Sequence, residues 1–149
     1  MTSPADMIPA SVIEATIQRL AFNGDGLIPA IAQQHDTGEV LMLAWMNAEA
    51  VRETLATGLV CYWSRSRRRL WRKGETSGQT QRLSHFRIDC DNDCLLLLVD
   101  QLGVACHTGR RSCFFTEISA HGPGTVLPVE KDPAKLYGED AQQSPKTGQ

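Results

Sequence analysis

The sequence feature that most constrains the fold is a series of short apolar segments between residues 59 and 119. Four of them are rich in aromatic and aliphatic side chains and are separated by turns that contain glycine or serine: residues 59–64, 82–89, 94–101 and 112–119. This length and composition are typical of β-strands. The chain of 149 residues is also long enough to bury one ordinary hydrophobic core. We therefore expect a single domain that is mainly β.

One main helix is expected before these strands. Asn47 stands at an N-cap position, the residues after it are good helix formers, and Gly58 supplies a stop. Further upstream, residues 27–34 and 39–46 flank a short turn, which is the pattern of an antiparallel hairpin. Residues 11–22 show approximate helical spacing and predict a short amphipathic helix. The expected fold class is α+β, mainly β with one main helix.

Charge and composition at the ends of the chain limit the possible functions. The formal net charge of -2 gives no overall attraction to nucleic acid or to membranes. No early apolar run resembles a signal peptide, and no segment reaches the roughly 20 apolar residues that span a bilayer. We therefore expect a cytoplasmic protein. Because glycine, proline and charged residues dominate after residue 120, we expect residues 1–120 to form the domain and residues 121–149 a flexible tail.

Three aspartates occupy alternate positions directly before an apolar run: Asp89, Asp91 and Asp93. In a regular strand they would lie roughly 6.6 Å apart, too far for all three to bind one ion. If the chain bends here, the carboxylates can converge on Mg²⁺ or Ca²⁺, which both prefer oxygen ligands. An EF-hand is disfavoured because Cys94 stands where that loop requires glycine. A solvated acidic loop remains the alternative.

Five cysteines, an odd number, favour thiolate ligands or unpaired core thiols over a disulfide framework in a cytoplasmic protein. Three of them bracket a strand and a loop: Cys90, Cys106 and Cys113. Three thiolates with an open fourth position resemble a catalytic zinc site. Cys61 and Cys94 are most simply interpreted as small buried hydrophobic residues. His107, next to Cys106, could be a metal ligand, a general base or an ordinary loop residue.

A basic stretch at residues 62–78 combines two tryptophans, Trp63 and Trp71, with six cations: Arg65, Arg67, Arg68, Arg69, Arg72 and Lys73. Guanidinium groups suit phosphate oxygens. One interpretation is single-stranded nucleic acid stacked on the tryptophans, and another is a small phosphorylated substrate. A solvated hairpin tip whose aromatic residues belong to the core is the structural alternative.

The segments "YWSRSRRRLWRKGETSG" and "DCDNDCLLLLVDQLGVACHTGRRSCFF" together resemble phosphoribosyl-AMP cyclohydrolase. This family opens the adenine ring of phosphoribosyl-AMP by hydrolysis in histidine biosynthesis. The resemblance covers roughly residues 27–117 and is to the monofunctional form. It implies a barrel-like, β-rich domain and a homodimer in which a zinc site is completed across the subunit interface.

The resemblance also implies a role for each motif residue. Zinc ligands would be Cys90, Cys106 and Cys113, and magnesium ligands would be Asp89, Asp91 and Asp93. His107 would take part in proton transfer, and the substrate pocket would be lined by Arg65, Arg67, Lys73 and Glu75. Gln79 stands where the family often has a histidine, which leaves that position a hydrogen-bonding role instead of a protonation role.

The function expected from the sequence is hydrolysis of the N1–C6 bond of 1-(5-phosphoribosyl)-AMP by a zinc-activated water, with Zn²⁺ and Mg²⁺ as cofactors. The expected partners are this small-molecule substrate and a second copy of the chain, with neither nucleic acid nor membrane. The main alternative is a zinc-stabilised module that binds single-stranded nucleic acid. A thiol redox protein is a further alternative.

Overall fold

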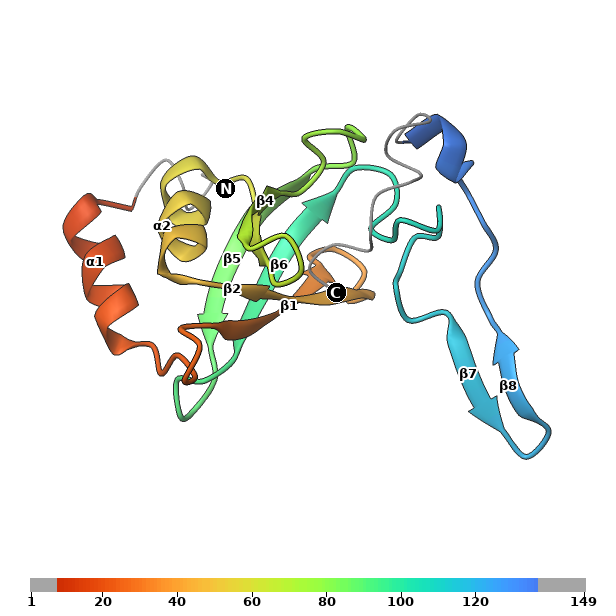
Figure 1. Cartoon of the computed structure of the whole chain (residues 1–149), viewed down its shortest axis with the longest axis horizontal. Helices are drawn as coiled ribbons and strands as arrows, with labels where there is room; N and C mark the ends of the chain where they lie inside the picture. Colours follow the sequence, from red (N-terminus) through yellow and green to blue (C-terminus); the bar gives the residue numbers. More distant parts are fainter. Residues whose placement is uncertain (1–7, 137–149) are drawn as a thin grey trace.

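The computed structural model describes residues 8–136. Its elements are, in chain order, α1 (Ala10–Arg19), β1 (Ile28–Gln34), β2 (Val40–Met46), α2 (Ala48–Thr57), β3 (Cys61–Ser64), β4 (Arg69–Arg72), β5 (Gln81–Ile88), β6 (Leu95–Gln101), β7 (Thr116–Ser119) and β8 (Gly122–Thr125). The first six strands form one sheet beside α1 and α2, and the last two form a separate hairpin (Figure 1). The expected class was mainly β with one main helix, and its coarser form is confirmed: the described part of the chain is mostly β, with α1 and α2 as helices of equal length.

The main sheet has the strand order β4-β3-β2-β1-β6-β5 and curls into a half-barrel. The predicted hairpin is present, because β1 and β2 pair antiparallel from Ile28 opposite Met46. β1 and β6 pair in parallel, whereas the other neighbouring strands are antiparallel. The curl brings the start of β3 back to β5, where the backbone N–H of Val60 donates to the carbonyl of Gln81 at 3.0 Å.

The concave face of the sheet and one side of each helix form the core. Alternate residues of β1 and β6 are buried, as expected for strands with one face in the core. The α2 helix begins as predicted, since the Asn47 side chain accepts a hydrogen bond from the backbone N–H of Ala50 at 2.8 Å. It ends at Gly58, also as predicted, and it buries Val51 and Leu55 against the sheet. Cys61 is fully buried in β3, whereas Cys94 is only partly buried.

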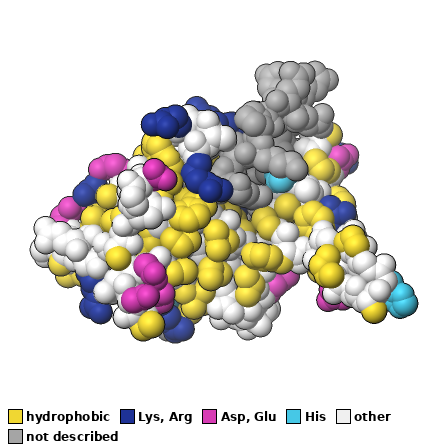
Figure 2. Space-filling view, turned by 60° about the horizontal axis from the view of Figure 1, so that its bottom comes forward, with side chains coloured by type: hydrophobic (Ala, Val, Ile, Leu, Met, Phe, Trp, Pro, Cys, Tyr) yellow, Lys and Arg dark blue, Asp and Glu magenta, His cyan; other side chains and the backbone are white. Residues whose placement is uncertain are grey.

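The other face of the sheet is also apolar, although it is not buried. Cross-strand pairing places Ile31 beside Leu43 and Leu96, and Trp45 beside Trp63, all on the side opposite the core. Figure 2 shows hydrophobic side chains gathered over the middle of one side of the molecule. We use the term outer apolar face for the following residues: Ile31, Leu43, Trp45, Trp63, Leu96 and Leu98. Each of them is at least partly exposed.

Two features of the C-terminal third were not predicted. β7 and β8 form a hairpin that projects away from the main sheet (Figure 1), and β8 lies within the segment expected to be a tail. Residues 137–149 lie outside the described part of the chain, so a flexible tail there stays a prediction. Within residues 8–136, neither the length nor the hydropathy of any helix suits a membrane span.

Candidate functional site

The acidic triplet lies in the turn between β5 and β6, and the chain bends there as the metal hypothesis requires. Asn92 adopts a positive φ of 65°, and one carboxylate oxygen from each of Asp89, Asp91 and Asp93 lies within 4.8 Å of the others. Asp89 stabilises the bend, because its Oδ1 accepts the backbone N–H groups of Asp93 at 3.0 Å and Cys94 at 3.1 Å.

The electrostatics of this turn reflect three carboxylates in close contact. Hydrogen bonds with Asp91 and Asp89 raise the pKa of Asp93 to about 6. Burial and the negative charge of those two aspartates act in the same direction. Burial opposes ionisation of Asp89, but hydrogen bonds from Asp93 and the backbone lower its pKa overall. A hard divalent cation with oxygen ligands would neutralise this concentration of charge.

The loop between β6 and β7 brings two of the predicted zinc thiols together. We call residues 103–113 the thiol loop. It turns back on itself through a hydrogen bond from the N–H of Cys106 to the carbonyl of Arg110, and the N–H of Cys113 reaches the carbonyl of Leu41 at 2.7 Å. Hydrogen bonds from Cys113, His107 and Thr108 lower the pKa of Cys106 to about 3, although burial acts in the opposite direction. The lowered pKa favours the thiolate form of Cys106, which is the form that binds metal.

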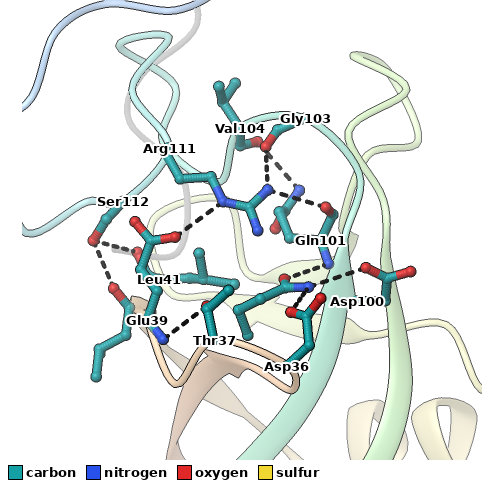
Figure 3. Close-up of polar contacts among 12 residues, drawn as sticks. Asp36, Thr37, Glu39, Leu41, Asp100, Gln101, Gly103, Val104, Arg111 and Ser112 are labelled. Atoms are coloured by element: carbon teal, nitrogen blue, oxygen red, sulfur yellow. Dashed lines mark hydrogen bonds and ion pairs between the residues drawn. The ribbon is translucent and has the colours of Figure 1, made fainter.

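Arg111 fixes the thiol loop to the sheet (Figure 3). Its guanidinium donates to the carbonyl oxygens of Gln101 at 3.1 Å and Gly103 at 2.6 Å, and it pairs with Glu39 at 3.2 Å. Arg111 was not among the predicted site residues. Its position inside the "CHTGRRSC" motif was the only signal, and that motif does not reveal the partners across the sheet.

Buried glutamines form hydrogen bonds that connect the thiol loop to the sheet. Gln81 donates to Gln101 at 2.8 Å and accepts from the hydroxyl of Tyr62 at 2.7 Å. The side chain of Gln101 donates in turn to the carbonyl of Val104 at 3.2 Å. Gln79 accepts the N–H of Val104 at 3.0 Å, so the hydrogen-bonding role expected at this position is confirmed.

The four residues predicted to line the substrate pocket do not come together within the chain. Lys73 is buried and Glu75 is exposed, and both line a pocket of about 440 Å³ beside the start of β3. Burial lowers the pKa of Lys73 to about 8. Arg65 and Arg67 lie in the turn at the other end of the β3–β4 hairpin, where the Arg65 guanidinium lies 5.0 Å from the centre of the Trp45 ring.

Other parts of the basic stretch are occupied within the fold. Arg72 makes two hydrogen bonds with Glu53, at 2.7 and 2.8 Å. Trp71 packs against Tyr62 with 5.4 Å between the ring centres. These contacts stabilise the β3–β4 hairpin. They agree with the structural alternative to nucleic-acid binding, in which the aromatic residues of this stretch belong to the core.

Cys90 lies before β6 in the chain, whereas Cys106 and Cys113 follow it, so they lie at opposite ends of that strand. The strand has seven residues, and at about 3.3 Å per residue it separates the two ends by about 20 Å. Among residues 8–136, the aspartate triplet is the only group of three or more potential ligands close enough to share an ion. The fold of one chain therefore does not bring the three predicted zinc thiols together.

A segment from beyond the expected domain boundary also contacts the thiol loop. We call residues 127–131 the C-terminal strap. The N–H groups of Glu130 and Lys131 both donate to the carbonyl of Gly109, at 2.8 and 3.0 Å. The side chain of Arg110 donates to the carbonyl of Leu127 at 3.0 Å. No local pattern in the sequence indicated these contacts.

Comparison with known proteins agrees with the motifs. A family model described as phosphoribosyl-AMP cyclohydrolase matches residues 42–115. The phosphoribosyl-AMP cyclohydrolase of Rhodospirillum centenum is 62% identical over 129 residues, which cover 87% of this chain and 97% of that protein. The one from Paramagnetospirillum magneticum is 67% identical over 123 residues, 83% of this chain and 93% of that protein. The resemblance inferred from the sequence is confirmed, and the chain belongs to the phosphoribosyl-AMP cyclohydrolase family.

Proposed function

We propose that this chain hydrolyses the N1–C6 bond of the adenine ring of phosphoribosyl-AMP in histidine biosynthesis. Family membership carries the proposal. The hydrogen-bonded thiols of Cys106 and Cys113, with His107 beside them, support it because they form a reactive site at the end of the sheet. In the reaction the oxygen of water becomes bonded to C6, the N1–C6 bond breaks, and N1 takes up a proton.

Cys106 and Cys113 fit zinc binding, because both sulfurs lie in one loop and Cys106 favours the thiolate form. Cys90 is proposed as the third ligand. A zinc ion held by three protein ligands can also bind a water and lower its pKa to near neutrality, which supplies the nucleophile. His107, the residue after Cys106, is proposed to transfer the proton as a general acid or base.

The third thiol has to come from a second copy of the chain. The length of β6 keeps Cys90 away from Cys106 within one protomer, and a two-fold dimer would give each of two equivalent sites one Cys90 and one thiol loop. The outer apolar face is the proposed contact surface. Exposed aromatic and aliphatic side chains that form a continuous surface are typical of protein interfaces.

This arrangement also explains the separation of the other predicted site residues. Asp89, Asp91 and Asp93 flank Cys90, so a proposed Mg²⁺ site would approach the thiol loop of the partner together with it. The substrate carries two phosphate groups, which Mg²⁺, Arg65 and Arg67 could bind. Lys73 and Glu75 line the pocket beside the start of β3.

The first test joins metal content to turnover. Cys106→Ala and Cys113→Ala should each lose zinc retention and ring opening together, as measured by metal analysis and by the ultraviolet absorbance of phosphoribosyl-AMP. Cys61→Ala is the matched control, because Cys61 is a buried residue of β3 with no proposed role in zinc binding. Wild-type activity in zinc-depleted Cys106→Ala protein would refute the zinc mechanism.

The second test addresses the shared site. Cys90→Ala and Cys106→Ala proteins should each be inactive, but a mixture should regain activity after subunit exchange. Each mixed dimer then has one intact site, and because random exchange makes half of all dimers mixed, recovery should reach about a quarter of wild-type activity. No recovery, despite exchange verified by mass spectrometry, would place all three thiols in one chain.

A further inference from the structure

Lys73 occupies a different environment from the other cations of the basic stretch. Only 6% of its surface is exposed, and its backbone N–H donates to the carbonyl of Val60 at 3.1 Å. Its ammonium lies 5.6 Å from the centre of the Trp71 ring and donates to the carbonyl of Ala105 at 2.8 Å. The ammonium therefore points into the protein, toward the thiol loop.

The contact with Ala105 fixes the peptide group directly before Cys106. The carbonyl of that peptide accepts from Lys73, while its N–H, which belongs to Cys106, donates to the carbonyl of Arg110 at 3.1 Å. Both sides of the peptide plane are thus held. Because the Cα of Cys106 belongs to this plane, its position depends on the Lys73 contact.

The charge of Lys73 also acts on the thiols. The ammonium is bound to the carbonyl of the residue before Cys106, and negative charge on Cys113 and Cys106 would raise the pKa of Lys73, against the effect of burial. Three thiolates around Zn²⁺ would carry a net charge of about -1, which a buried cation compensates. The exposed arginines of the β3–β4 turn lie too far along the hairpin to replace it.

We propose that Lys73 is a positioning residue for the zinc site: its ammonium orients Cys106 through the Ala105 carbonyl and compensates the thiolate charge. This inference rests on the proposed function for its metal. It assigns Lys73 to the thiol loop instead of to a substrate phosphate. Residues outside the metal ligands that orient them commonly change metal affinity by about 10- to 100-fold when removed.

The experiment measures zinc affinity by competition with a chromophoric chelator, without substrate. Lys73→Met should bind Zn²⁺ at least about tenfold more weakly than wild type, and Lys73→Arg, which keeps the charge, should lose less. Lys135→Met is the matched control, because Lys135 is exposed and remote from the thiols in sequence. Circular dichroism checks folding, and if Lys73→Met does not fold, the neutral Lys73→Gln takes its place with the same expectation.

A second measurement separates positioning from substrate binding. At saturating zinc, Lys73→Met should keep the KM for phosphoribosyl-AMP within about twofold of wild type, because a residue that acts through another affects metal binding first. Unchanged zinc affinity in a folded Lys73→Met protein, or a large rise in KM with zinc affinity intact, would overturn the inference. If wild type binds zinc but does not open phosphoribosyl-AMP, the proposed function fails while the zinc comparison still decides the role of Lys73.

Discussion

The contact between the C-terminal strap and the thiol loop can be tested at Gly109. This residue has a φ of +85°, a conformation that costs a residue with a Cβ about 1 kcal/mol. A Cβ at Gly109 would also overlap the backbone carbonyl oxygen of Lys131. Both groups belong to the backbone, so neither can move aside as a flexible side chain would. The strap therefore has to shift away from Gly109. Two hydrogen bonds to the Gly109 carbonyl would be lost, each contributing about 1 kcal/mol.

Gly109→Ala should therefore lower the free energy of unfolding by about 3 kcal/mol, as measured by urea denaturation of the metal-free protein. Gly26→Ala is the matched control. Its φ is +74°, but a Cβ there would have no neighbour within 4 Å, so only the cost of the backbone conformation, about 1 kcal/mol, is expected. In a chain that ends at Val126 and therefore lacks the strap, Gly109→Ala should lower the free energy of unfolding by only this cost, about 1 kcal/mol. Equal losses for both variants in the full chain would refute a stabilising role of the strap.

Three further predictions concern metal, pH and the buried glutamines. Asp91→Asn should lower ring-opening activity in a way that added Mg²⁺ partly restores, and no change at any Mg²⁺ concentration would remove the acidic turn from the mechanism. Because burial lowers the pKa of Lys73 to about 8 from 10.5, the unfolded chain binds more protons between these values, and unfolding free energy should rise with pH there. Relative to Lys73→Met, urea denaturation of metal-free wild type should show a gain of about 2 kcal/mol from pH 8 to pH 10, and a flat difference would contradict the lowered pKa. Gln81→Leu should cost about 3 kcal/mol by leaving two buried polar partners unsatisfied, whereas the exposed Gln18→Leu should change stability by less than about 0.5 kcal/mol.

The elements that were predicted correctly are those whose signals are local. The cap at Asn47, the stop at Gly58 and the hairpin turn between β1 and β2 each depend on residues a few positions apart. The run of leucines and valine in β6 likewise indicated a strand, and alternate residues of this strand are buried. β4 and β8 were missed because arginine, glycine and proline dominate them, and only pairing with a neighbouring strand makes them strands.

The sequence by itself determined the β-rich class, the identity of the motifs and, through those motifs, the family. Tertiary structure decided how the motif residues are distributed: it bent the acidic turn into a cluster, paired Cys106 with Cys113, and set Cys90 at the far end of β6. It also turned Lys73 inward while Arg65 stayed at the surface. The physical reason is that side-chain chemistry follows from residue type alone, whereas distances between residues far apart in the chain depend on sheet curl, strand length and loop closure.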